Sequence, residues 1–140
     1  MKVKKYKFYI GIDCGVNTGV AVWNSEAQKF IGVGSMKIHE AMELIKDYVF
    51  SMEVFVRVED ARLRKWFGPR SDAKLQGAGS VKRDAKIWED FLVFYNIPFE
   101  MVPPQFNATK LKAEVFAKIT KWERKTNEHA RDAAMLVFKK

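Results

Sequence analysis

Alternating apolar and polar positions predict three strands near the start of the chain. From Lys7 to Asp13 every second side chain is apolar, which is the period of a β-strand. Residues 15–19 are rich in turn-forming types and residues 20–23 resume the apolar pattern, so we expect a hairpin. Residues 29–38, after another polar turn, are predicted to form a third strand. Three consecutive strands with short turns predict an antiparallel meander.

After residue 38 the apolar pattern alternates between helical spacing and short β-branched runs. The predicted helices cover residues 39–51, 71–96, about 107–121 and 127–139, and the predicted strands cover residues 54–59 and 98–103. A strand–helix–strand connection implies parallel neighbours. We therefore predict one α/β domain, residues 1–140, with a five-stranded mixed sheet flanked by helices. The antiparallel meander forms one part of that sheet and parallel strands form the rest.

Composition indicates the cellular setting of the protein and the kind of partner that it binds. No apolar run approaches the ~18 residues that span a bilayer, so no membrane association is expected. A single cysteine, Cys14, excludes an internal disulfide and favours a reducing, cytoplasmic compartment. The formal net charge of +8 favours polyanionic partners. Basic residues interleaved with aromatics between Arg57 and Lys86 suit a nucleic-acid surface.

Three acidic residues occupy the ends of separate predicted elements. Asp13 ends the first strand and Glu59 ends the fourth, and parallel neighbours would bring their backbones within ~4.8 Å. His129 and Asp132 are three residues apart at the start of the last helix, so they share a face. Carboxylates this close need a neutralising cation, and oxygen ligands favour Mg²⁺ or Mn²⁺.

Each acid also has a structural interpretation. Asp13 could be a turn or capping residue, Glu59 beside Asp60 a solvated strand end, and Asp132 a surface helix residue partnered by His129. Because neighbouring strand residues point to opposite faces, at most one of Glu59 and Asp60 enters the site. The coincidence of three acids from separate elements favours a metal site.

Four motifs resemble those of RuvC-type Holliday junction resolvases of the ribonuclease H-like superfamily. Residues 10–22 resemble the opening signature, residues 56–61 the second acidic strand, residues 74–79 with Arg83 the start of the long helix, and residues 129–133 the closing pattern. The predicted order of strands and helices is also that of the ribonuclease H-like fold. In length the chain is similar to the compact phage-type members.

The resemblance implies a function as well as a fold. It implies that Asp13, Glu59 and Asp132 are catalytic metal ligands, and that His129 is a further ligand or positions water. It also implies Mg²⁺ or Mn²⁺, with two ions per site, and a homodimer that hydrolyses phosphodiesters symmetrically in a four-way DNA junction. Such an enzyme of DNA recombination and repair would act at the nucleoid or in the cytosol of a phage-infected host.

Basic and aromatic residues are candidates for DNA contact. They are Arg62, Arg64, Lys65, Trp66, Phe67, Arg70, Lys74, Lys82, Arg83, Lys110 and Lys112. Bacterial members place a junction-wedging aromatic soon after the second acid, where Arg62 and Leu63 stand here. Trp66 and Phe67 follow slightly later, and their alternative roles are a core residue and a loop anchor. For Lys110 and Lys112, taken singly, the pattern favours the solvated face of a helix start over a phosphate contact.

Three other functions share part of this pattern. Sugar kinases and actin-like ATPases open similarly but need two such domains, and the chain has the length of one. A YqgF-like nuclease acting on structured RNA would use the same fold and acids, since phosphate contacts do not distinguish RNA from DNA. A non-catalytic nucleic-acid-binding module would lose one or more acids, and all are present here.

Overall fold

The computed structural model describes residues 5–63, 72–104 and 111–140, with only the backbone over residues 72–78. The strands are β1 (Phe8–Asp13), β2 (Asn17–Asn24), β3 (Lys29–Lys37), β4 (Val54–Glu59) and β5 (Phe99–Val102). The helices are α1 (Ile38–Ser51), α2 (Asp72–Phe94), α3 (Ala113–Thr120) and α4 (Glu128–Met135), with the short 3₁₀ helix η1 (Ala61–Leu63) after β4.

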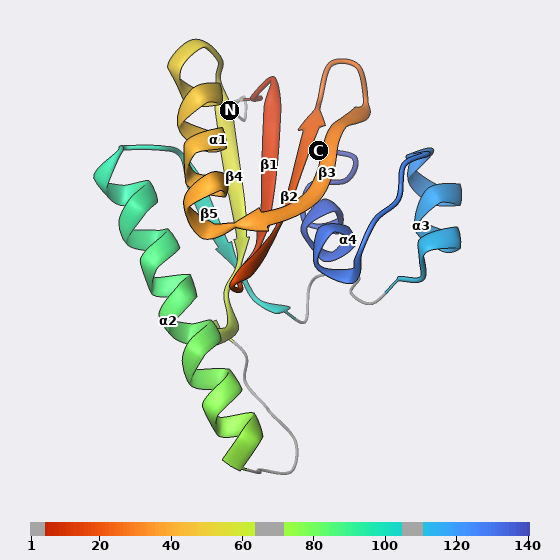
Figure 1. Ribbon diagram of the computed structural model, residues 1–140. Helices are drawn as coiled ribbons and strands as arrows, with labels where there is room; N and C mark the ends of the chain where they lie inside the picture. Colours follow the sequence, from red (N-terminus) through yellow and green to blue (C-terminus); the bar gives the residue numbers. More distant parts are fainter. Residues whose placement is uncertain (1–4, 64–71, 105–110) are drawn as a thin grey trace.

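The five strands form one mixed sheet in the order β3-β2-β1-β4-β5 (Figure 1). β1 pairs antiparallel with β2, and β2 pairs antiparallel with β3. β1 pairs parallel with β4, and β4 pairs parallel with β5. This arrangement confirms the predicted meander joined to parallel strands.

The two faces of the sheet are covered by different helices. Alternate residues of β1, such as Ile10 and Ile12, pack in one cluster with Ile45 of α1 and Trp88 of α2. On the opposite face, β2 and β3 contribute Ala21, Trp23 and Phe30 to a second cluster with Phe116 of α3 and Leu136, which follows α4. The sheet is therefore the middle of three layers, with α1 and α2 on one face and α3 and α4 on the other (Figure 1).

Several predicted boundaries were wrong by a few residues. β2 begins at Asn17, inside the predicted turn, and the buried Thr18 hydroxyl donates a 2.8 Å hydrogen bond to the Gly15 carbonyl. α3 begins only at Ala113, because Lys112 has extended dihedral angles and caps the helix. Residues 107–110 of the predicted helix lie outside the described residues. α4 ends at Met135, and turns follow it.

In the described part of the chain, no helix combines the length and the apolar character that a membrane crossing requires.

Candidate active site

Asp13 and Glu59 lie opposite each other at the carboxyl ends of β1 and β4. The parallel register makes their Cα atoms direct partners. The preceding residues, Ile12 and Val58, are buried in the core on the α1/α2 face. Because successive strand residues point to opposite faces, both acidic side chains point to the face that α4 covers. The predicted convergence of these two strand ends is therefore present in the fold.

Two glycines bring α4 into contact with the backbone of the sheet. A Cβ atom on Gly11 would overlap the carbonyl oxygen of Ala133, and one on Gly19 would overlap that of His129. Gly11 is two residues before Asp13, and Gly19 pairs with Asp13 across the β1–β2 hairpin. The absence of side chains at these two positions lets the first turn of α4 lie directly beside Asp13.

Polar contacts hold α4 at both ends. At its start, the Asn127 side chain accepts a 2.8 Å hydrogen bond from the Ala130 amide and donates one of 2.7 Å to the Ser35 hydroxyl. Beyond its end, the Arg57 guanidinium donates to the Leu136 carbonyl and pairs with Glu100 of β5 at 3.2 Å. These contacts fix the direction in which α4 presents its side chains.

His129 connects α4 directly to the acid on β1. Its Nδ1 lies 3.0 Å from a carboxylate oxygen of Asp13, although the two residues are 116 positions apart. Asp132, one turn further along α4, is only 9% exposed. The structure thus places three of the predicted residues, Asp13, His129 and Asp132, in one small region.

Burial raises the pKa of Asp13 from 3.8 to about 6. The loss of hydration is the largest cause, and the hydrogen bond from His129 opposes it. The negative charges of Asp132 and Glu128 raise the pKa further. An acid that is both desolvated and surrounded by other acids is a functional-site candidate on physical grounds.

The donor set fits a divalent cation in the kind of its ligands. The ligand types are the carboxylates of Asp13, Glu59 and Asp132 and the imidazole of His129, all of which Mg²⁺ or Mn²⁺ accepts. A cation would also relieve the repulsion between the negative charges around Asp13. Within the described ranges, however, no three His, Cys, Asp or Glu side chains are gathered closely enough to hold an ion. Metal binding would therefore require these side chains to converge further.

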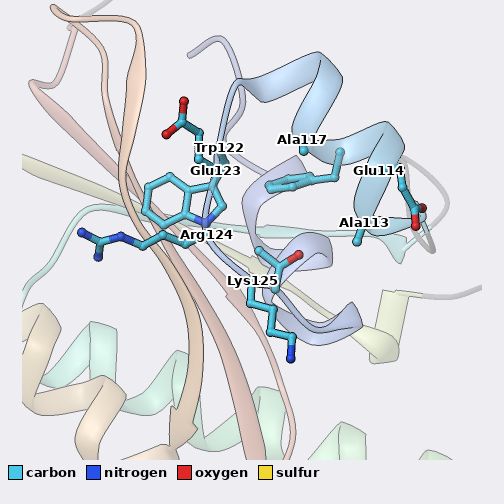
Figure 2. A pocket seen from close by; sticks show the side chains of 9 residues that line it. Ala113, Glu114, Ala117, Trp122, Glu123, Arg124 and Lys125 are labelled. Carbon is cyan, nitrogen blue, oxygen red and sulfur yellow. The ribbon is translucent and has the colours of Figure 1, made fainter.

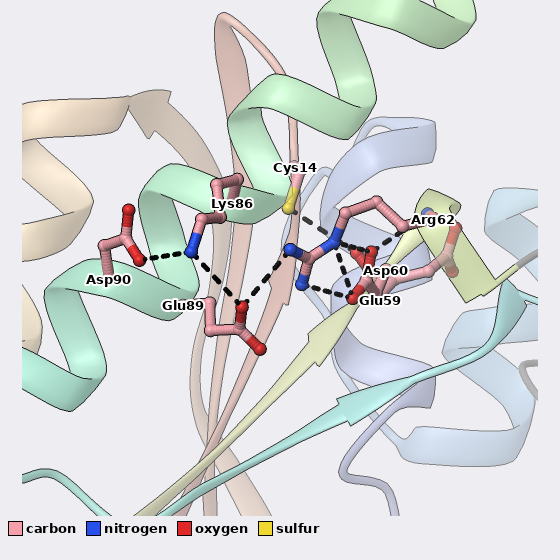
Figure 3. Close-up of polar contacts among 7 residues, drawn as sticks. All are labelled: Cys14, Glu59, Asp60, Arg62, Lys86, Glu89 and Asp90. Atoms are coloured by element: carbon pink, nitrogen blue, oxygen red, sulfur yellow. Dashed lines mark hydrogen bonds and ion pairs between the residues drawn. The ribbon is translucent and has the colours of Figure 1, made fainter.

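Asp60 lies on the other side of the strand end and is bound by an arginine. Its side chain is 1% exposed and pairs with the Arg62 guanidinium at 2.7 Å, and Arg62 also reaches Glu89 of α2 at 3.2 Å (Figure 3). The hydrogen bonds that Arg62 donates to Asp60 and Glu89 raise the pKa of Arg62. Asp60 and Arg62 thus join η1 to α2, and the prediction that Arg62 contacts DNA is not tested.

Cys14 fills space next to Asp13, at the carboxyl end of β1. It is buried, and its thiol donates a weak hydrogen bond to the Glu59 carbonyl at 3.5 Å (Figure 3). Burial raises its pKa far above the ordinary value, as does the negative charge of Asp13. A thiol in this state is a poor nucleophile.

Most of the predicted DNA contacts fall on residues that the structure does not describe. Arg64, Lys65, Trp66, Phe67, Arg70 and Lys110 lie outside the described residues, and of Lys74 only the backbone in α2 is described. Lys82 is partly buried on α2, whereas Arg83 of α2 and Lys112 before α3 are exposed.

Sequence reasoning missed the residues that position α4. Gly11 and Gly19 interrupt otherwise apolar strands, which is the available signal for a close backbone approach. Asn127 before a helical pattern is the usual signature of an N-cap. Arg57 carried no such signal, because its partner Leu136 is 79 residues away.

A hollow of about 420 Å³ lies between α3 and the segment that leads to α4 (Figure 2). Its lining residues include Phe116, Trp122, Arg124 and Lys125. None of the predicted catalytic residues lines it, so it is separate from the candidate active site.

Comparisons with known proteins identify a fold. No protein-family model matches the chain, and no curated protein matches it. Among solved structures, it is similar to RuvC of T. thermophilus in complex with a Holliday junction substrate. The TM-score is 0.54 with 18% sequence identity, over 94% of this chain and 90% of that one. Together with the strand order and the helices on both faces of the sheet, this likeness shows that the chain has the ribonuclease H-like fold.

Proposed function

We propose that the protein is a metal-dependent endonuclease that cuts four-way DNA junctions. The observation that carries this proposal is the shared position of Asp13 and Glu59 on one face, with His129 bound to Asp13. The solved RuvC structure, which holds a Holliday junction, supports junction DNA as the substrate. The excess of basic residues supports a polyanionic partner.

Asp13, Glu59 and Asp132, together with His129, would hold Mg²⁺ or Mn²⁺. When bound, such ions supply activation of water and stabilisation of the leaving oxygen in phosphodiester hydrolysis. His129 orients the Asp13 carboxylate through its 3.0 Å contact. Gly11 and Gly19 keep α4 close enough for Asp132 to face the same region. Arg57 and Asn127 maintain the orientation of the helix.

The basic residues would bind the phosphate backbone around this site. Lys112 is exposed beside α3, and the basic segment from Arg64 to Arg70 directly follows η1. Phosphate contacts position a nuclease but do not select DNA over RNA. A YqgF-like nuclease that acts on structured RNA is therefore the alternative function. A cleavage assay with both DNA and RNA substrates distinguishes the two.

The test is cleavage of labelled substrates by the purified protein. A four-way DNA junction, its matched duplex, a single strand and a structured RNA are each incubated with Mg²⁺, Mn²⁺ or EDTA. We expect paired, symmetric nicks in the junction that need a metal and disappear in Asp13→Asn and Asp132→Asn. The matched control is Asp47→Asn, an exposed acid on α1, which should cut normally.

Metal binding is measured separately by calorimetry with Mg²⁺ or Mn²⁺ in the absence of DNA. Asp13→Asn should weaken binding, whereas Asp47→Asn should not. Metal-dependent cutting of RNA but not of the junction would show that the protein is the RNA nuclease instead. Junction binding without cleavage under any metal would contradict the nuclease proposal and leave a binding module.

A further inference from the structure

The hollow between α3 and the segment that leads to α4 has aromatic and small apolar residues in its lining. Phe116 is only 1% exposed, whereas Trp122 is partly exposed at the side of the hollow (Figure 2). Ala113 and Ala117 of α3 also line it, and their short side chains leave the space open. Its volume of about 420 Å³ lies within the range of about 300–1,000 Å³ that is usual for small-ligand sites. The hollow can therefore receive a planar organic group.

Backbone contacts fix the position of Trp122. α3 ends at Thr120, and Lys121 adopts left-handed dihedral angles that turn the chain back. The Thr120 hydroxyl donates a 2.8 Å hydrogen bond to the Phe116 carbonyl and accepts one of 3.2 Å from the Trp122 amide. The indole nitrogen is buried and has no hydrogen-bond partner among the described residues, so Trp122 offers its ring rather than a donor. A ring held in this way is a preformed stacking surface.

Charged side chains of both signs stand around the hollow. Arg124 and Lys125 extend outward from it (Figure 2), and the Arg124 guanidinium lies 5.9 Å from the centre of the Trp122 ring. Glu114 and Glu123 are exposed in the same lining. The two acids disfavour an acidic peptide or a free phosphate. A nucleotide suits both signs, because its phosphate attracts the basic residues and the amino groups of its base donate to carboxylates.

The hollow adjoins the helix that carries the candidate catalytic residues. Thr126 lines the hollow and is three residues before His129, so their Cα atoms lie within about 11 Å. Arg131 of α4 donates hydrogen bonds to the Thr126 carbonyl at 2.9 Å and to the Thr126 hydroxyl at 3.0 Å. Since phosphates follow each other at about 3.4 Å along one strand of a duplex, the hollow is about three nucleotides away from the candidate active site.

We propose that the hollow binds one unpaired base of the nucleic acid that the active site cuts. The base stacks on Trp122, and the phosphates on either side of it contact Arg124 and Lys125. This inference rests on the proposed function and adds a substrate feature to it, namely a base released from pairing near the cut. Stacking uses the face of a base, so the hollow accepts different bases.

The test compares the affinities of two labelled single strands by fluorescence anisotropy in EDTA. One is a mixed pyrimidine strand, and the other keeps every phosphate but has abasic sites in place of its central bases. The wild type should bind the abasic strand about tenfold more weakly. Ala117→Leu fills the hollow without removing a contact, and it should bind both strands with the lower affinity. Val115→Leu, an exposed position of α3 outside the hollow, should retain the tenfold difference.

Variants of Trp122 test the stacking surface itself. Trp122→Phe should keep most of the difference between the two strands, whereas Trp122→Ala should lose it, with melting temperatures measured for both. Equal binding of the two strands by a wild type that still cuts junctions would overturn the base site and leave the nuclease. An Ala117→Leu variant that still prefers the strand with bases would also overturn it. Failure to bind any nucleic acid would contradict the proposed function as well.

Discussion

Asp13 is an acid in an environment that disfavours its charge. Its folded pKa of about 6 lies above the ordinary value of 3.8, so the folded protein binds this proton more tightly than the unfolded chain. The resulting stability is fully present below about pH 4. It is lost as the pH rises through about 6, because the folded state must then hold a poorly solvated carboxylate.

We therefore expect Asp13→Asn to increase the stability of the metal-free protein, relative to the wild type, more at neutral pH than at acid pH. The difference in unfolding free energy between the variant and the wild type should grow by about 2–3 kcal/mol from pH 4 to pH 7, since each pKa unit is worth about 1.4 kcal/mol. Urea denaturation at several pH values in EDTA measures it. A difference that does not change with pH would show that the pKa of Asp13 is not raised.

Arg62 neutralises the buried carboxylate of Asp60, directly after β4. Arg62→Ala would leave the buried Asp60 carboxylate without its closest cation, and we expect a loss of about 3 kcal/mol in unfolding free energy. Chemical denaturation at pH 7 tests this value. Adding Asp60→Asn to the same chain removes the unpaired charge and should recover part of the loss. A fully stable Arg62→Ala would contradict the structural role.

Strand and helix patterns predicted the positions of Asp13, Glu59 and Asp132 but not their contacts. A period of two establishes which face an acid occupies, and it placed Asp13 and Glu59 correctly on a common edge. The 3.0 Å contact between His129 and Asp13 depends on how α4 crosses the sheet. That crossing is set by backbone overlap at two glycines, which no local pattern specifies.

Among the described helices, α4 lies directly against the backbone of β1 and β2. Gly11 and Gly19 are in strands that would gain β propensity from almost any other residue. The need for glycine at both positions is explained by the carbonyl oxygens of Ala133 and His129, which occupy the space of a side chain. Packing of α4 thus takes precedence over local strand preference.

We expect Gly19→Ala to displace the first turn of α4 and to lower the unfolding free energy by about 2–3 kcal/mol. The rate of junction cleavage should fall by a larger proportion than the unfolding free energy does. The matched control is Gly34→Ala on β3, where a Cβ atom meets nothing within 4 Å among the described residues. That variant should be neutral or slightly stabilising. Thermal melting and junction cleavage of both variants provide the comparison, and equal behaviour would contradict the role of Gly19.

Element types were predicted more reliably than element ends. All five strands and the long helix α2 were predicted, from alternation in the first strand, from short apolar runs in later ones and from helical spacing in α2. The start of β2 was missed because Asn17 and Thr18 are turn-forming types, yet the hydrogen bond of Thr18 to Gly15 satisfies its hydroxyl within the strand. Lys112 favours a helix by propensity but adopts an extended conformation as the cap of α3.

For the whole molecule, the dominant property is the excess of positive charge. A net charge of +8 on 140 residues should make nucleic-acid binding strongly dependent on salt. With about four phosphate contacts, affinity for a four-way junction should fall roughly a hundredfold between 50 and 200 mM salt. Fluorescence anisotropy in EDTA measures this dependence without cleavage. An affinity that does not change with salt would argue against phosphate contacts.

The contact between Asp13 and His129 joins residues separated by 116 positions, and this separation has a consequence for how the protein reaches its folded state. The β1–β2–β3 meander closes through short turns and can form early, whereas docking α4 must first close a long loop. We therefore expect the acids to come together late in folding. A partly folded chain could then retain its sheet while lacking the candidate active site, so the proposed cleavage would report completed folding more strictly than secondary structure does.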